Sequence, residues 1–388
     1  MKEGYPSFEN TEIAFGHKTK KELKNAIMLF KAFKYPFLVF QGPLIAEFAL
    51  KIGLPIKGML KRTLFYQFCG GETIEECNAT ISTLALNEIG TILDYSVEGE
   101  KKEMSFDATL NEVLKTVAKT ADSKYIPFCV FKVTGIMRFE LMEKIQRAEE
   151  LTEDEQIELD KARTRIDTIC FQADEAGTKV LVDAEESWVQ TTIDLMVEEM
   201  MEKYNKKRVV VFNTIQLYRK DKLEYLKNSI IYNENYFQGF KLVRGAYMER
   251  ERERARQMGY PSPINDTKED TDKDYNSGLE FCITNLNKVE LCAGTHNEES
   301  SLILCELMEK HNIKRNDRRV YSAQLYGMSD HISYNLAKEH YHVAKYVPFG
   351  PVKAVLPYLG RRAKENSSIG DQVGRELQLL KKELARRA

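Results

Sequence analysis

The 388 residues include 57 Lys and Arg against 59 Asp and Glu, a formal net charge of −2 at pH 7. Apolar residues make up 43% and charged residues 30%, an ordinary balance for a globular protein. A charge this close to zero gives no reason to expect a nucleic-acid partner. The seven cysteines are widely spaced and contain no C-x-x-C pair, which indicates free thiols in a reducing compartment rather than a disulfide framework or a zinc site.

No run of 18 apolar residues is present, so we expect no transmembrane helix. Residues 1–20 are polar and mixed in charge, which is typical of neither a signal peptide nor a transit peptide. The most apolar stretch, residues 26–50, is interrupted by Lys31, Lys34 and Glu47. We expect a core helix there, and the alternative is a face that lies on a membrane surface.

The first 90 residues are predicted to form helices only, at 21–34, 44–50, 60–68 and 74–87. We therefore assign residues 1–90 to an N-terminal helical arm.

Eight β-type runs rich in Val, Ile, Leu and Phe then alternate with helical patterns. They lie at residues 91–97, 126–133, 179–182, 208–215, 240–243, 289–293, 320–324 and 343–347. Strands that are buried on both faces have such continuous apolar sequences. The alternation predicts an α/β fold, a (β/α)8 barrel of the TIM type over residues 91–388.

One connection, at about residues 139–176, is too long for a simple crossover. It contains an acidic segment, and Thr152 and Glu155 have the spacing of a capping box that starts a helix. We predict an inserted helical hairpin here, since the ligand spacing and central Gly of a calcium loop are absent.

Barrels of this kind place their chemistry at the carboxyl ends of the strands. The residues there are polar or aromatic: Lys132, Asp183, Gln216, Lys241, Arg244, Tyr247, Thr295, His296, Asn297, Gln324 and Tyr346. Any one of them could serve the fold alone, but the set indicates a site. His340 and His342 form the only close His pair, and they precede a strand end, so we expect no metal site. No G-x-G-x-x-G or P-loop pattern supports a Rossmann-type nucleotide site.

The helix expected after the eighth strand carries two adjacent arginines. Tyr358, Arg361, Arg362 and Glu365 have the spacing i, i+3, i+4, i+7, so they share one helix face. Paired guanidinium groups match a carboxylate through bidentate hydrogen bonds. The alternative, which spacing alone leaves open, is a solvated helix with an Arg–Glu pair.

Several of these motifs together resemble the proline dehydrogenase family. They are Leu-Asp-Tyr-Ser-Val-Glu at 93–98, Val-Asp-Ala-Glu-Glu at 182–186, Lys-Leu-Val-Arg-Gly-Ala-Tyr at 241–247, Thr-His-Asn at 295–297, Tyr-Gly-Met at 326–328 and Tyr-Leu-x-Arg-Arg-x-x-Glu-Asn at 358–366. The resemblance covers about residues 91–370. It implies an FAD-dependent barrel that oxidises L-proline to Δ1-pyrroline-5-carboxylate, by hydride transfer from C5 to flavin N5, and passes electrons to a quinone at a membrane.

The resemblance also implies a substrate site. Arg361, Arg362 and Lys132 would pair with the proline carboxylate, and Asp183 would balance these cations. Three further residues would surround the ring: Tyr346, Tyr358 and Leu325. The bulk of Tyr346 would crowd a 4-hydroxyl group, which argues against a hydroxyproline-oxidising relative.

The same resemblance implies a cofactor site. The matching positions are Asp183, Ala184, Gln216, Lys241, Val243, Arg244, Gly245, Ala246, Tyr247, Lys268, Thr295, His296, Asn297, Gln324 and Glu365. Gln216 and Lys241 would lie near flavin N5 and O4, and Glu365 would tie the arginine helix to the ribityl chain. Many bacterial members have Arg at the position of Lys241 and Lys at that of Arg244, so we expect a different flavin potential.

The chain lacks the aldehyde-dehydrogenase and DNA-binding domains of the bifunctional relatives, so we expect a monofunctional enzyme of the eukaryotic-type branch. We expect a cytoplasmic location, with peripheral contact at the inner face of a membrane, while the oligomeric state is left open. Two alternatives remain at this point: a hydroxyproline-oxidising flavoenzyme, and a non-redox barrel that binds an anion without a flavin.

Overall fold

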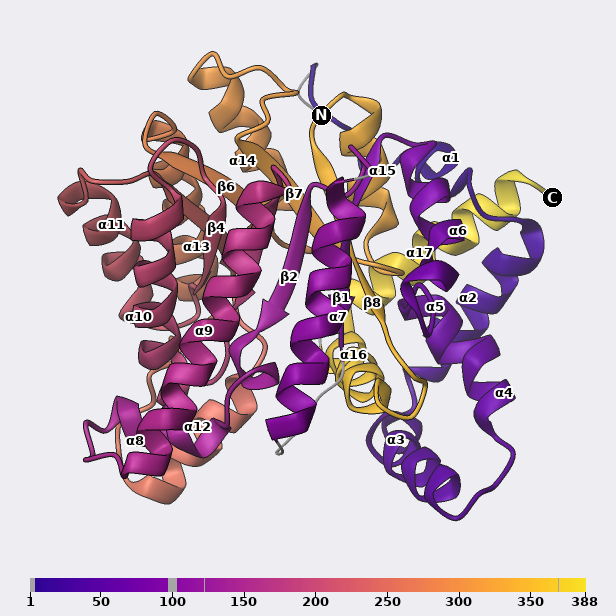
Figure 1. Cartoon of the computed structure of the whole chain (residues 1–388). Coiled ribbons are helices and arrows are strands. Elements are labelled where there is room, and N and C mark those ends of the chain that lie inside the picture. The colour runs from indigo at the N-terminus through magenta and orange to yellow at the C-terminus, as the bar shows by residue number, and fades with distance from the viewer. Residues whose placement is uncertain (1–3, 97–102, 122, 369) are drawn as a thin grey trace. The chain divides into compact units, whose positions relative to one another are not determined.

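A computed structural model of the chain describes residues 4–96, 103–121, 123–368 and 370–388 (Figure 1). Val97 and Glu98, which belong to the first predicted strand and motif, lie outside the described residues.

Eight parallel strands pair in chain order and close into a barrel. They are β1 (Ile89–Tyr95), β2 (Phe128–Lys132), β3 (Lys179–Asp183), β4 (Val211–Gln216), β5 (Gln238–Val243), β6 (Val289–Gly294), β7 (Val320–Leu325) and β8 (Val343–Phe349). The predicted TIM-type α/β barrel is confirmed. Helices cover the outside of the strands in Figure 1.

Strand boundaries differ from the predicted ones by up to three residues, most at the start of the fourth strand. The fourth apolar run was predicted to begin at residue 208, whereas β4 begins at Val211. The side chain of Asn205 explains the difference, because its Oδ1 accepts the N–H groups of Val210 and Val211 at 2.9 Å each. These two N–H groups therefore bond to a side chain and not to a neighbouring strand, while the Val210 carbonyl accepts the Val180 N–H at 2.7 Å.

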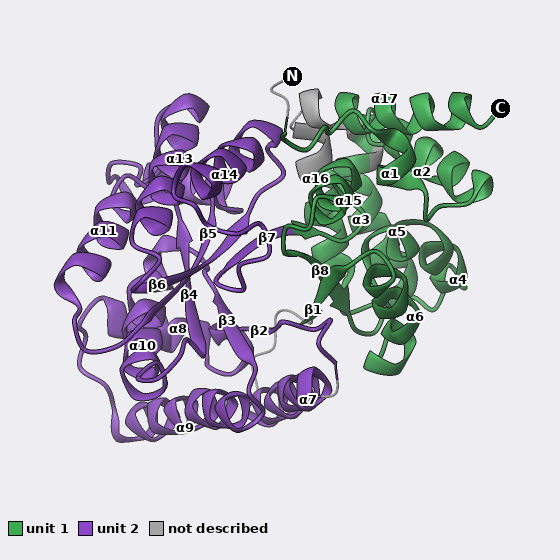
Figure 2. Ribbon diagram, turned by 90° about the horizontal axis from the view of Figure 1, so that it is seen from above, with its two compact units in different colours: residues 1–98, 324–388 green, residues 99–323 purple. Residues whose placement is uncertain are grey.

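The chain divides into two compact units, which Figure 2 colours separately. Unit 1 comprises residues 1–98 and 324–388, and unit 2 comprises residues 99–323. The helices of unit 1 are α1 (Thr11–Phe15), α2 (Lys20–Ala32), α3 (Pro36–Lys51), α4 (Lys57–Leu60), the π-helix η1 (Lys61–Phe65), α5 (Tyr66–Phe68), α6 (Ile74–Ala85), α15 (Asp330–Lys338), α16 (Leu356–Ser368) and α17 (Gly370–Arg386). The predicted division at residue 90 stays a prediction.

In unit 1 the two ends of the chain are joined by polar contacts. Thr11 donates to Glu383 at 2.9 Å, and Arg387 donates to the carbonyl of Phe15 at 2.8 Å. A buried ion pair lies between β8 and α15, where Lys345 Nζ is 2.9 Å from Asp330. Burying both charges requires such pairing.

The apolar stretch at residues 26–50 differs from its prediction as one core helix. It forms the end of α2 and most of α3, which are separated at residues 33–35. Helix α2 buries Leu23, Ile27 and Phe30 in the core of unit 1. Helix α3, by contrast, keeps several large apolar side chains exposed. Within the described ranges, no helix has the length and apolar content that crossing a membrane requires.

Unit 2 holds the remaining helices. They are α7 (Glu103–Ala121), the 3-10 helix η2 (Val133–Gly135), α8 (Phe139–Gln146), α9 (Glu153–Glu175), α10 (Ser187–Tyr204), α11 (Lys222–Tyr232), α12 (Met248–Met258), α13 (Lys268–Thr284) and α14 (Glu298–Lys310). Residues 139–175 thus form two helices, and the capping box predicted at Thr152 and Glu155 is present. The buried Arg165 anchors α9 to α7 by ion pairs with Asp107 and Glu103. The seven cysteines are free and buried, as their spacing predicts.

Candidate active site

A carboxylate between two lysines lies at the carboxyl ends of the strands in unit 2. Lys132 ends β2 beside Asp183, which ends β3, and their Nζ and Oδ2 atoms are 3.3 Å apart. Lys241, from β5, pairs with the other oxygen of Asp183. Burial alone would raise the pKa of Asp183, but Lys241 and Lys132 outweigh burial and hold it below its ordinary value. The two ammonium groups and the carboxylate thus form one cluster at the strand ends.

Glu185 connects the ends of three strands. Its carboxylate accepts the backbone N–H of Thr134 at 3.1 Å and the Thr134 hydroxyl at 2.6 Å. Its backbone carbonyl accepts the side-chain amide of Gln216 at 2.6 Å, which fixes how that amide lies at the end of β4. Burial raises the pKa of Glu185 to about 7, against the hydrogen bonds from Thr134. Ala184 lies between Asp183 and Glu185 and is half-buried.

Sequence reasoning assigned no role to Glu185, although it lies in the Val-Asp-Ala-Glu-Glu segment. A carboxylate directly after a buried strand was the available signal.

Arg244 is the centre of a second cluster. Its Nε donates to Asp272 at 2.7 Å, Nη1 to the Thr295 hydroxyl at 2.8 Å and Nη2 to Ser300 at 2.9 Å. The guanidinium carbon lies 4.4 Å from the centre of the Tyr275 ring. All three donor positions of this guanidinium thus have acceptors, which joins β5 to the helices α13 and α14.

The amino terminus of α14 lies beside this cluster. The Asn297 side chain accepts the Ser300 N–H at 2.9 Å and caps the helix, and the Asn297 N–H donates to Thr295 at 3.1 Å. His296, between them, is half-buried. The predicted residues Arg244, Thr295 and Asn297 are therefore together. Asp272 and Ser300, which complete the cluster, were missed because both are polar residues inside helices.

Gly245 follows β5 with a backbone φ of +140°, a conformation that residues other than glycine rarely adopt. A Cβ atom there would lie 2.5 Å from ring carbons of Tyr218. The packing of Tyr218 alone thus requires glycine at this position. Val243 is half-buried just before it, and Ala246 is exposed just after it.

Tyr247 and Lys268 lie at the ends of the loops that lead into helices. Tyr247 is the residue before α12, and its carbonyl accepts the Glu251 N–H at 2.9 Å. Lys268 begins α13 with 66% of its side chain exposed, and it pairs with Asp272. Since Asp272 also binds Arg244, Lys268 is connected to the Arg244 cluster through a shared carboxylate.

The remaining predicted residues belong to unit 1. Tyr358 and Arg362 are mostly buried on α16, and the guanidinium carbon lies 5.1 Å from the centre of the Tyr358 ring. At 7% exposure, Arg362 does not fit a solvated helix face. Arg361, next to it, is half-buried. The side chain of Glu365 lies outside the described residues.

Strands β7 and β8 supply three more predicted residues of unit 1. Gln324 is buried, and its Oε1 accepts the Ser333 hydroxyl at 2.8 Å. Tyr346 is 7% exposed, and its carbonyl accepts the Tyr326 N–H at 2.8 Å. Leu325 is half-buried. Because Lys132 belongs to unit 2 and the two arginines to unit 1, their convergence on one carboxylate stays a prediction.

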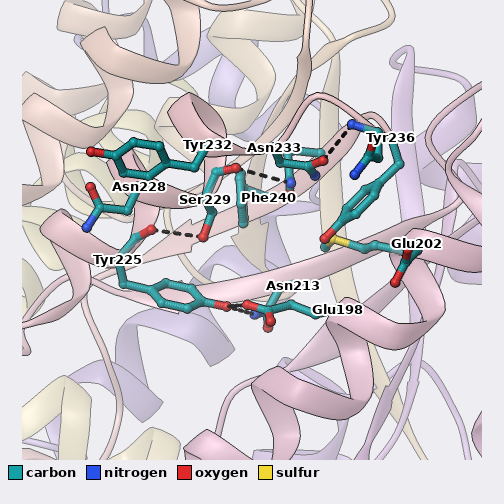
Figure 3. Close-up of a pocket in the computed structure, with 13 residues that line it drawn as sticks. Glu198, Glu202, Asn213, Tyr225, Asn228, Ser229, Tyr232, Asn233, Tyr236 and Phe240 are labelled. Carbon is teal, nitrogen blue, oxygen red and sulfur yellow. Dashed lines mark hydrogen bonds between the residues drawn. The ribbon is translucent and has the colours of Figure 1, made fainter.

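A cavity of about 310 Å³ in unit 2 lies away from these residues (Figure 3). It lies between α10, α11 and the loop before β5, near the amino-terminal half of that strand. In Figure 3 the Tyr225 hydroxyl points toward Glu198 and Asn213. None of the predicted site residues lines this cavity, so it is separate from the candidate active site.

Comparison with known proteins gives one family. The sequence profile described as proline dehydrogenase matches residues 77–375. Proline dehydrogenase 1, mitochondrial, of Dictyostelium discoideum is 31% identical and covers 97% of this chain, which spans 74% of that protein. The carbapenem antibiotics biosynthesis protein CarD of Pectobacterium carotovorum subsp. carotovorum is 33% identical, with 82% of this chain and 83% of that protein covered.

Solved structures support the fold. Proline utilization A of Bdellovibrio bacteriovorus superposes with a TM-score of 0.73 at 19% identity, over 95% of this chain and 40% of that one. This chain thus spans less than half of that larger protein. With the family profile matched over most of its length, the chain belongs to the proline dehydrogenase family, the oxidoreductases that oxidise proline to Δ1-pyrroline-5-carboxylate.

Proposed function

We propose that the protein oxidises L-proline with bound FAD and passes the electrons to a quinone. The observation that carries the proposal is the Lys132–Asp183–Lys241 cluster at the carboxyl ends of the strands, where one carboxylate lies between two cations. Cationic groups in a partly buried place can contact the anionic groups of a ligand. Membership of a family that generally depends on FAD supports FAD as the cofactor beside this cluster.

The residues of unit 2 fit FAD. The Arg244 guanidinium and the amino terminus of α14 lie together at the strand ends, and they are groups that would hold a pyrophosphate. Gln216, held by Glu185, and Lys241, held by Asp183, offer oriented polar groups at the strand ends where the ring would lie. FAD, when bound, would supply the oxidising chemistry as the acceptor of a hydride from C5 of proline.

The substrate side of the proposal rests on α16 and β8. Arg361, Arg362 and Lys132 would hold the proline carboxylate, and stacking on Tyr358 restricts how the Arg362 guanidinium turns. Tyr346 and Leu325 would pack against the pyrrolidine ring. Fixing the carboxylate and the ring together places C5 in one position, which is how positioning lowers a barrier.

The quinone, the peripheral membrane contact and the cytoplasmic location belong to the same proposal. Cell fractionation would test the location, and reduction of a soluble quinone analogue by the proline-reduced protein would test the acceptor.

The main test is spectroscopic. The purified protein should show a flavin spectrum, directly or after added FAD, and anaerobic L-proline should bleach it. A protein that stays colourless with added FAD would refute the proposal. Bleaching by trans-4-hydroxyproline in place of L-proline would redirect it to the hydroxyproline-oxidising alternative.

The roles of the arginines need variants. Arg361→Met or Arg362→Met should raise the apparent KM for proline by roughly 10- to 100-fold, the usual value of a hydrogen bond to a charged group, while FAD stays bound. Arg318→Met is the matched control, since Arg318 is exposed in the loop before β7, at the opposite ends of the strands. An unchanged KM in both α16 variants would show that these arginines do not bind the substrate.

A further inference from the structure

The cavity between α10, α11 and the loop before β5 has an acidic, hydrogen-bonding lining (Figure 3). Two glutamates, five amide side chains, one serine and three tyrosines line it, together with Met201 and Phe240. All of these lining residues are described by the structure, and none of them is Lys, Arg or His. Its volume of about 310 Å³ is within the range of small-molecule pockets.

The two carboxylates of this cavity have no countercharge. Glu198 and Glu202 lie one turn apart on α10, a spacing at which like charges destabilise a helix. Within the described parts of the chain, neither carboxylate takes part in an ion pair. Lys222, whose Nζ lies 4.1 Å from the centre of the Tyr225 ring, is already paired with Asp194. Because Glu198 is half-buried, a cation beside it would be stabilising.

Asn233 adds a hydrogen-bond donor to the lining. Its Oδ1 accepts the Asn235 N–H at 2.9 Å, which fixes the orientation of the amide. Its Nδ2 atom is buried and has no hydrogen-bond partner among the residues that the structure describes. A buried donor requires an acceptor, and an ammonium group offers none. A ligand that satisfies both Glu198 and Asn233 therefore carries a positive charge and an oxygen atom.

The wall behind Glu198 is held by a buried hydrogen-bond network. The Tyr225 hydroxyl donates to Glu198 at 2.5 Å and accepts Asn213 Nδ2 at 3.4 Å. Asn213, which is 1% exposed, also donates to Asp194 at 2.9 Å. Side chains fixed in this way lose little conformational freedom when a ligand binds, which favours binding of a small molecule.

We propose that this cavity binds a small organic cation that carries hydroxyl groups, an amino alcohol by chemical class. The ammonium group contacts Glu198 and Glu202, and a hydroxyl oxygen accepts the Nδ2 hydrogen of Asn233. The tyrosine rings contact the carbon skeleton of the ligand and favour its positive charge. This site is separate from the Lys132–Asp183–Lys241 cluster, so the proposal goes beyond the proposed function and does not depend on FAD or proline.

Saturation-transfer NMR with the full chain as purified tests the proposal with three probes of similar size. Glucosamine carries an ammonium group and hydroxyls, glucose carries hydroxyls alone, and cyclohexylamine carries the ammonium group alone. At about pH 6 the amines keep their protons. Glucosamine should bind, and the Kd of each other probe should be at least about 10-fold higher, because each lacks one set of contacts.

Variants of the lining locate the bound probe. Glu198→Gln keeps an acceptor for Tyr225 but removes the charge, so the Kd for glucosamine should rise roughly 10-fold while that for glucose stays the same. Ser229→Leu fills part of the cavity and should weaken both sugars. The matched control is Glu199→Gln, the same change at an exposed neighbour outside the lining, and it should bind glucosamine like the wild type.

Three results would overturn the proposal. They are an absence of glucosamine binding, glucose binding as tight as that of glucosamine, and equal losses of glucosamine affinity in Glu198→Gln and Glu199→Gln. Binding that Ser229→Leu leaves unchanged would likewise place the probe elsewhere. Flavin bleaching by proline, which should be the same in the wild type and in Glu198→Gln, separates failure of this inference from failure of the proposed function.

Discussion

Replacing Asp183 with Asn should destabilise unit 2 strongly. The substitution keeps the size of the side chain but leaves Lys241, which is 5% exposed, and the half-buried Lys132 without their shared countercharge. Removing one partner of a buried ion pair costs about 3–5 kcal/mol. Because Lys132 is partly solvated and the single Asn oxygen still accepts a hydrogen bond from one of the two ammonium groups, we expect about 3 kcal/mol.

Trp188, the only tryptophan, gives an assay specific to unit 2. It lies in α10 with the Arg254 guanidinium 4.4 Å from its ring, so its fluorescence should change when this unit unfolds in urea. The matched control is Asp266→Asn, since Asp266 pairs with Lys220 at an exposed position. Its loss should lower the free energy of unfolding by only about 0–1 kcal/mol. Equal free energies of unfolding for the Asp183 and Asp266 variants would refute the argument that the buried cluster needs its carboxylate.

Two further predictions concern the same region and the same assay. The pKa of Glu185 is raised to about 7, so the folded state keeps this proton to a higher pH than the unfolded chain does. The free energy of unfolding should therefore fall by roughly 3 kcal/mol as pH rises from about 4.5 to about 7. Glu185→Gln should flatten this dependence of stability on pH, and an unchanged dependence would contradict the assignment. Gly245→Ala should lower the free energy of unfolding by about 3 kcal/mol, through backbone strain and the clash with Tyr218. In the control Gly259→Ala, φ is +73° and the space is open, so the loss should be about 1 kcal/mol. Similar losses of stability in both variants would show that the contact with the Tyr218 ring does not matter.

The barrel could be predicted because its strands are buried on both faces. All six residues of β4 are buried, for example, and its polar residues are Asn213, Thr214 and Gln216. Asn213 Oδ1 accepts the Thr214 N–H, and the Thr214 hydroxyl donates to the Val182 carbonyl of β3. Burial on both faces removes the alternation that would make a strand ambiguous. The start of β4 could not be predicted, since it depends on a side chain, Asn205, that folds back from the preceding helix.

Site residues on strand ends could be identified by residue type, but not by what they bind. Arg244 was expected at the cofactor, which stays a prediction, and within the fold its donors contact Asp272, Thr295 and Ser300. Partners that come from distant helices leave no local pattern in the sequence. The outward orientation of α3 was predicted only as the alternative to a core helix, because hydropathy alone does not distinguish a helix in the core from one with an exposed apolar face.

The exchanged cations at positions 241 and 244 now have a structural explanation. Arg244 uses Nε, Nη1 and Nη2 on three different acceptors, a set that the single ammonium group of a lysine cannot reach. Lys241 instead contacts one carboxylate, for which a compact ammonium suffices. An Arg at 241 and a Lys at 244 would require both sets of partners to change together. The charge expected near flavin N5 is therefore set by Lys241 and Asp183 as a pair. The effect of a substitution at Lys241 on the flavin potential should be measured in protein that retains Asp183.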